Sequence, residues 1–84
     1  MMKKIKVVDE FNSTKVIIAD SIASVEFSAE PVVTIKEKDS SETYVYGSGT
    51  HKEVGIIESD GRDQVFECTE DGLKKFVDTF YKTV

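Results

Sequence analysis

The chain has 84 residues, of which 39% are hydrophobic and 32% are charged, and its net charge is −5 at pH 7. This length and composition are typical of one small folded domain and exclude a disordered segment. An acidic chain is poorly suited to nucleic-acid binding, which depends on lysine and arginine side chains that neutralise phosphates.

No stretch of the sequence approaches the roughly 20 apolar residues that a membrane-spanning helix requires, so we expect no membrane span. The N-terminal MMKKIKVVDEF has positive charges but not the long apolar run of a signal peptide. Cys68 is the only cysteine, which excludes an internal disulfide. Together these features predict a cytoplasmic protein that forms a single domain over residues 1–84.

The hydrophobic residues of the first half recur mostly at every second position, the period of a β-strand. Ile5 and Val7 indicate one strand, and residues 16–18 indicate a second strand after the turn-like FNSTK. The segment from Ile22 to Phe27 alternates imperfectly. It therefore predicts either a strand with a bulge or a helical turn followed by a strand.

The segment VVTIKEKDSSETYVY predicts a hairpin whose loop is residues 39–41. This register sets Ile35 opposite Val45 in the core. It also sets Lys38 opposite Glu42 at the tip, so that β-branched residues and opposite charges form the cross-strand pairs that stabilise antiparallel strands.

The stretch YGSGTHKEVG, residues 46–55, combines three glycines with the only histidine. A phosphate-binding P-loop requires a lysine directly after its last glycine and a helix after the loop, whereas EVGII predicts a strand. A dinucleotide fingerprint also fails, because Lys52 stands where its third glycine is required. We therefore interpret the stretch as a turn between two strands.

The segment ESDGRD contains the turn signal of a second hairpin. A three-residue loop, DGR, sets Val54 opposite Cys68. It also sets Ile56 opposite Phe66, which leaves one face of the hairpin apolar, as burial requires. Gly61 then takes the position with positive φ.

The hydrophobic period changes to that of a helix in TEDGLKKFVDTFYKTV. Thr69 suits the N-cap, and the acidic residues 70–71 occupy the first turn, where the helix dipole favours negative charge. The spacing predicts one amphipathic helix over about residues 70–83 that packs on the strands. Its apolar stripe consists of Leu73, Phe76, Val77, Phe80, Tyr81 and Val84.

Six to seven short strands within residues 3–68, followed by one C-terminal helix, predict an α+β domain. We expect an antiparallel meander sheet or a half-open barrel that the amphipathic helix closes.

This order of elements is similar to that of small bacterial pleckstrin-homology-like domains. The segment ADSIASVEF, followed by VVTIKEKDSSETYVY, also resembles the opening of short flagellar FlbD-type proteins. The resemblance covers about residues 20–46 and 65–84. It implies a module that binds peptides, proteins or lipid headgroups without catalysing a reaction, and it assigns no functional residue.

Few side chains in the sequence could carry catalysis or bind a metal. One histidine, His51, and one cysteine fall short of the three or four ligands of a zinc site. Cys68 is expected on the inward face as a small hydrophobe, and the paired carboxylates are expected in solvated turns. We therefore expect no catalytic residue, no metal and no cofactor.

Two tyrosines provide the better candidate site, because exposed tyrosines are enriched at protein interfaces. In the predicted hairpin register they share the outer face of the sheet with a lysine. The alternative is that these rings partly cover the second face of the sheet or the helix. The candidate contact surface consists of Lys36, Tyr44, Tyr46 and His51.

We expect a small non-catalytic binding module of bacterial or phage origin that acts through contact with a protein partner or through homodimerisation. Two alternatives stay open. The first is an acidic inhibitor of phage type that imitates nucleic acid, which requires one continuous acidic face. The second is a regulatory subunit or a small enzyme, which requires a concave pocket with at least two convergent polar side chains.

Overall fold

The computed structural model describes residues 3–28, 31–39, 43–47 and 49–83. Within these residues lie seven β-strands, one α-helix and one short 3-10 helix. None of these helices is long and apolar enough to cross a membrane. The elements in chain order are β1 (Lys4–Asp9), β2 (Thr14–Ile18), η1 (Ala19–Ser21), β3 (Ile22–Ser28), β4 (Val32–Glu37), β5 (Thr43–Gly47), β6 (His51–Ile57), β7 (Asp63–Glu67) and α1 (Glu70–Thr83).

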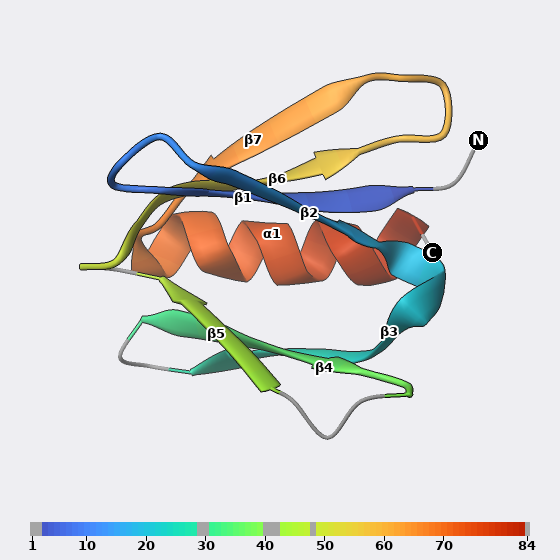
Figure 1. Ribbon diagram of the computed structural model, residues 1–84, viewed down its shortest axis with the longest axis horizontal. Helices are drawn as coiled ribbons and strands as arrows, with labels where there is room; N and C mark the ends of the chain where they lie inside the picture. Colours follow the sequence, from blue (N-terminus) through green and yellow to red (C-terminus); the bar gives the residue numbers. More distant parts are fainter. Residues whose placement is uncertain (1–2, 29–30, 40–42, 48, 84) are drawn as a thin grey trace.

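The strands form two antiparallel sheets with the helix between them (Figure 1). One sheet has the order β2-β1-β6-β7 and the other has the order β3-β4-β5. The helix α1 contacts β6 and β7 of the first sheet and β3 and β4 of the second. The predicted α+β fold with a C-terminal helix is confirmed, and the sheets do not close into a barrel.

One side of the fold is bounded by the edge strands β2 and β5, which end their respective sheets. Lys15 of β2 places its Nζ atom 3.6 Å from the ring centroid of Tyr44 on β5. This distance is that of a cation–π contact. A contact between side chains therefore links the two sheets along this side, where their backbones are not paired.

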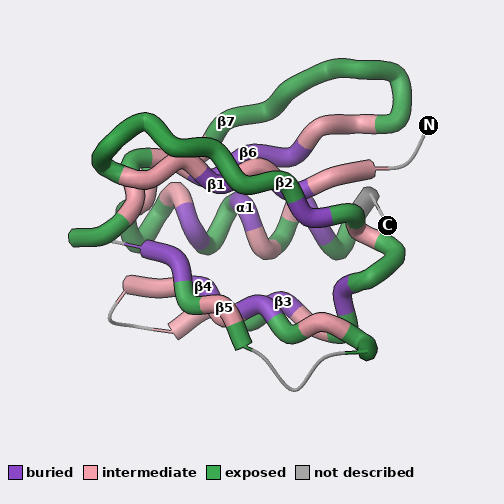
Figure 2. The backbone as a smooth tube through the Cα atoms, in the orientation of Figure 1, coloured by how far each residue is buried: buried purple, intermediate pink, exposed green. Residues whose placement is uncertain are grey.

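The core lies between the sheets and the helix (Figure 2). Alternate strand residues and one stripe of the helix point into it, as the two periods predict. Its buried apolar side chains are Ile5, Val7, Ile17, Ile22, Val25, Val33, Ile35, Tyr46, Val54, Ile56, Leu73, Phe76 and Phe80.

The helix has the predicted bounds and the predicted N-cap. The backbone nitrogen of Gly72 donates a hydrogen bond to Thr69 Oγ1 at 3.1 Å. Phe76 of the apolar stripe is fully buried, whereas the ring of Tyr81 is about half exposed. Val84 lies outside the described residues.

The β6–β7 turn begins one residue earlier than the sequence predicts. Gly61 N donates to the Glu58 carbonyl at 2.9 Å, and Glu58 N donates to the Arg62 carbonyl at 2.7 Å. The loop is therefore residues 59–61 and not residues 60–62. Its three-residue length is as predicted, and the positive φ of Gly61 (92°) is confirmed. A type I turn followed by a left-handed residue requires its glycine at the third loop position, which explains the shift.

This shift changes the cross-strand partners but not the faces of the strands. Val54 pairs with Phe66, and Ile56 pairs with Gln64. The predicted pairs of Val54 with Cys68 and of Ile56 with Phe66 are therefore wrong by two residues along β7. Because side chains alternate with a period of two, a two-residue shift leaves the same side chains facing the core.

The β4–β5 hairpin differs from its predicted register by one residue. Ile35 pairs with Tyr44, and Val33 pairs with Tyr46. The predicted pair of Ile35 with Val45 is therefore wrong: Val45 is 55% exposed, whereas Tyr46 is only 6% exposed. The observed register turns the tyrosine side chains inward, and aromatic rings bury far more apolar area than one valine.

Part of the predicted loop of this hairpin is not described. Ser40, Ser41 and Glu42 lie outside the described residues, and so does the predicted pair of Lys38 with Glu42.

The segment from Ile22 to Phe27 takes the first of its two predicted forms, a strand with a bulge, and lies wholly within β3. The helical turn η1 precedes β3. The pairing of β3 with β4 then shifts register between Ile22 and Ser24. The imperfect alternation within Ile22 to Phe27 therefore reflects the bulge, and the helical turn lies before this segment.

Candidate functional site

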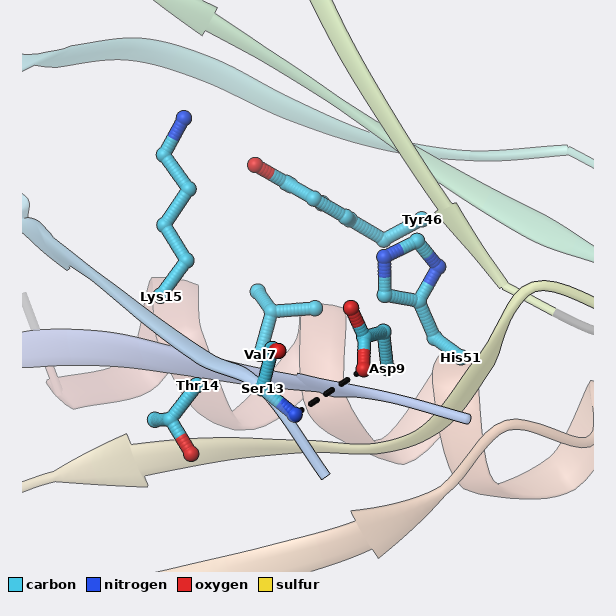
Figure 3. A pocket seen from close by; sticks show the side chains of 7 residues that line it. All are labelled: Val7, Asp9, Ser13, Thr14, Lys15, Tyr46 and His51. Atoms are coloured by element: carbon cyan, nitrogen blue, oxygen red, sulfur yellow. Dashed lines mark hydrogen bonds between the residues drawn. The ribbon is translucent and has the colours of Figure 1, made fainter. Parts of the chain in front are cut away.

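A pocket of about 190 Å³ opens between the ends of the β1–β2 hairpin and the β5–β6 corner. We call it the seam pocket, because its walls come from both sheets. Figure 3 shows the side chains that line it. These residues are Val7, Asp9, Ser13, Thr14, Lys15, Tyr46 and His51.

Asp9 and His51 face each other across β1 and β6, where the pairing shifts register between Val8 and Asp9. Such bulges redirect side chains. Asp9 Oδ1 accepts hydrogen bonds from the backbone nitrogens of Phe11 at 2.8 Å and Ser13 at 3.0 Å. The carboxylate therefore holds the hairpin turn in shape while it lines the pocket (Figure 3).

The imidazole of His51 is held by two neighbours. Its Nδ1 atom lies 2.7 Å from Thr50 Oγ1, which also donates to the Gly47 carbonyl at 3.3 Å. Its ring meets the ring of Tyr46 edge to face, with the centroids 4.9 Å apart. These contacts fix the β5–β6 corner and place the imidazole against the buried tyrosine.

The hydroxyl of Tyr46 is buried and has no hydrogen-bond partner among the described residues. Burial raises the pKa of Tyr46 to about 12, and the neighbouring Tyr44 and Glu37 contribute further. The hydroxyl is therefore protonated at neutral pH and available as a hydrogen-bond donor. A buried hydroxyl without a partner costs about 1–3 kcal/mol of stability.

Lys15 brings a positive charge to the same wall of the pocket. The Lys15 ammonium lies over the ring of Tyr44. This ring is nearly parallel to the ring of Tyr46, and the two ring centroids are 6.1 Å apart. In Figure 3 the Tyr46 hydroxyl points to the side of the pocket where the Lys15 amino group lies, away from His51. An ammonium group has three donors, so it can hydrogen-bond while it contacts a ring.

The structure brings together three of the four predicted contact residues and separates the fourth. Tyr44, Tyr46 and His51 form one aromatic cluster. Lys36 is exposed and pairs with Thr43, on the face of its sheet that points away from the core. The predicted outer position of the tyrosines beside Lys36 is wrong, because the β4–β5 register differs by one residue.

Sequence reasoning missed Asp9 and Lys15 as site residues. The segment DEFNS carries a readable signal, since Asp and Asn are the residues that stabilise such a turn. Lys15 has no local signal, because its place in the pocket depends on how the two sheets approach each other.

Two other candidates for chemistry are the thiol of Cys68 and a metal site, and the described surroundings favour neither. Burial, with the nearby carboxylate of Glu53, raises the pKa of the Cys68 thiol, so the reactive thiolate is scarce at neutral pH. Among the residues that the structure describes, no three His, Cys, Asp or Glu side chains lie close enough together to hold a metal ion.

The seam pocket meets the condition that an enzyme requires, because several polar side chains converge in it. The hydroxyl next to the imidazole, however, belongs to Thr50, which does not line the pocket. A nucleophile must face the substrate while its base holds it. Thr50 and His51 therefore do not form a nucleophile and a base that both face this pocket.

Comparisons of the chain with protein-family models, curated proteins and solved structures find no match.

Proposed function

We propose that the protein is a small non-catalytic binding module that acts in the cytoplasm through contact with a protein partner. The observation that carries this proposal is the edge strand β2, where Val16 and Ile18 are 48% and 44% exposed. An extended segment of the partner would pair with β2 and add a strand to the four-stranded sheet.

The strand β2 combines a free edge with exposed apolar side chains. Ile17 points into the core, so its neighbours Val16 and Ile18 point to the outer face. Phe11 lies in the turn at the end of the same hairpin and is 84% exposed. Edge strands are usually protected by charges, proline or bulges, whereas the sequence of β2, TKVII, has a single lysine.

Local charge favours an acidic segment as the occupant of this edge. Lys4 stands opposite Ile18 on the neighbouring strand, on the same outer face as the exposed side chains. A second copy of the chain would bring a second Lys4 toward the same surface, where like charges repel. A partner segment that alternates acidic and apolar residues would complement both the charge and the exposed side chains.

Imitation of nucleic acid is less well supported. Among the described residues, four carboxylates pair with lysines: those of Glu58, Asp63, Glu70 and Asp78. A role in binding also agrees with the resemblance to pleckstrin-homology-like and FlbD-like domains, which stays part of the proposal.

A peptide titration tests this function. The probe is a capped peptide of alternating valine and glutamate, added to the isotope-labelled chain and followed by nuclear magnetic resonance. We expect saturable shifts of the backbone amides of β2. The double variant Val16→Asp with Ile18→Asp should bind at least about tenfold more weakly, the loss typical of an interface hot spot.

Val65→Asp is the matched control, because Val65 is 51% exposed on β7, the other edge of the same sheet. It should bind the peptide as the unchanged chain does. Shifts confined to β7, or no saturable shift, would contradict the proposal. If the unchanged chain forms a dimer and the double variant does not, the occupant of the β2 edge is a second copy of the chain and not a different protein.

A further inference from the structure

The seam pocket contains two hydrogen-bonding groups that the described contacts leave unused. Tyr46 is a core residue, yet its hydroxyl has no partner among the described residues. The ammonium of Lys15 lies over the ring of Tyr44, and no ion pair joins it to a carboxylate within the part of the chain that the structure describes. Buried polar groups in folded proteins nearly always have a hydrogen-bond partner, so an orphaned hydroxyl beside a pocket requires an explanation.

We propose that the seam pocket binds a small molecule that carries a carboxylate or phosphate group, with the Tyr46 hydroxyl as hydrogen-bond donor and Lys15 as counter-ion. This site is separate from the β2 edge of the proposed function. The volume of about 190 Å³ suits a small molecule or its acidic group.

The chemistry of the lining residues favours an anion over a cation. Burial keeps the Tyr46 hydroxyl protonated, because its pKa is raised to about 12, so it donates to an oxyanion instead of providing a negative oxygen. Lys15 supplies the positive charge, and a hydrogen bond between an ammonium and an oxyanion is about twice as strong as one between neutral groups.

Asp9 orients the bound anion. One of its carboxylate oxygens already accepts two backbone hydrogen bonds, and its negative charge repels an anion from that end of the pocket. The anionic group therefore lies toward Lys15 and Tyr46, and the rest of the molecule lies toward His51. A metal ion is the weaker alternative, because the described residues contain no cluster of three metal ligands.

The test uses the whole chain with inorganic phosphate and acetate as probes, at constant ionic strength maintained with chloride. We expect either anion, or both, to shift the amides of Lys15, Tyr46 and His51 saturably. The relative affinities of the two probes distinguish a phosphate-bearing from a carboxylate-bearing molecule. Lys15→Gln should weaken binding by about tenfold or more, because it removes a charged hydrogen bond.

Tyr46→Phe separates a binding role from a structural one. It should weaken anion binding several-fold, because it removes the donor, while the stability of the anion-free chain is unchanged or increased. Replacing a buried hydroxyl that has no partner costs nothing in packing when the ring is kept.

Lys36→Gln is the matched control, because Lys36 is an exposed lysine on a strand face that points away from the pocket. It should leave the anion affinity unchanged. The proposal would be overturned if the shifts spread over all lysines. It would also be overturned if neither Lys15→Gln nor Tyr46→Phe changed the affinity of the chain for the anion. A loss of stability in Tyr46→Phe without anion would also overturn it, since the hydroxyl would then have an internal partner.

Discussion

The hydroxyl of Tyr81 makes two hydrogen bonds to the backbone of Val25. It accepts one from the Val25 nitrogen at 2.9 Å and donates one to the Val25 oxygen at 2.9 Å. Val25 lies in β3, an edge strand of the three-stranded sheet, and Tyr81 lies near the end of α1. One side chain therefore takes the place of a neighbouring strand at this residue and ties the helix to the sheet.

Tyr81→Phe removes both hydrogen bonds and keeps the ring. We expect it to lower the free energy of unfolding by about 1–2 kcal/mol, because one backbone donor and one acceptor lose their partner. Urea denaturation measures this change. Lys82→Ala is the control, since it breaks only the exposed pair with Asp78, which is worth a few tenths of a kcal/mol. An equal loss in both variants would contradict the edge-capping role of Tyr81.

Gly72 stands in the first turn of α1 because the end of β7 lies against it. A Cβ atom at this position would lie 2.1 Å from the carbonyl oxygen of Glu67, which is far inside van der Waals contact. Helix propensity alone predicts that Gly72→Ala stabilises the helix by about 1 kcal/mol. We expect the opposite sign, because the helix start or the strand end must move.

Thermal unfolding of Gly72→Ala checks this sign, with Lys75→Ala as the control on an exposed position of the same helix. Lys75→Ala should change the melting temperature little. A higher melting temperature for Gly72→Ala would show that β7 and α1 do not approach as closely as the structure places them.

The β1–β2 and β6–β7 hairpins use the same turn with different residues. Asn12 has φ 65° and Gly61 has φ 92°, each at the third position of a three-residue loop. Asparagine tolerates the left-handed region better than other residues with a side chain, and glycine adopts it freely. The two turns should therefore accept each other's residue and reject alanine.

We expect Asn12→Gly to change stability by less than about 0.5 kcal/mol and Asn12→Ala to lower it by about 1 kcal/mol. Gly61→Asn should likewise cost less than Gly61→Ala. Chemical denaturation of the four variants gives this order directly. Equal losses for the alanine and the exchanged residue at either turn would contradict the shared geometry.

Local signals were sufficient to predict the helix and the existence of the β4–β5 and β6–β7 hairpins. The apolar stripe, the Thr69 cap and the acidic first turn all indicate the helix α1, and its bounds are confirmed. The turn signal around Gly61 likewise predicts a three-residue loop with positive φ. These features depend on neighbours in the sequence, which is why they can be read from it.

The strand register was not predictable, because both faces of β5 carry apolar residues. Val45 and the two tyrosines alternate along the strand, so either face can be buried without breaking the two-residue period. The contact of Tyr46 with His51 and that of Lys15 with Tyr44 join residues from different strands. Because these contacts arise from the packing of the two sheets, they have no local signature in the sequence, unlike the turn that places Asp9.

The buried Tyr46 hydroxyl should make the stability of the fold fall in alkaline solution. Its pKa in the folded chain, about 12, lies above the ordinary value of 10.0, so the unfolded chain loses this proton first as the pH rises. The free energy of unfolding is therefore not affected by this titration below pH 10, and it falls as the pH rises from 10 toward 12. The decrease is at most about 1.4 kcal/mol per pH unit.

Urea unfolding between these two pH values measures the decrease, and the comparison with Tyr46→Phe removes the contribution of the lysines, which titrate in both chains. The free energy of the unchanged chain should fall relative to that of Tyr46→Phe as the pH rises. The free energy of unfolding of Tyr81→Phe should fall with pH as steeply as that of the unchanged chain, because this variant keeps Tyr46. Parallel curves for the unchanged chain and Tyr46→Phe would place the hydroxyl in water and remove the buried donor on which the anion site depends.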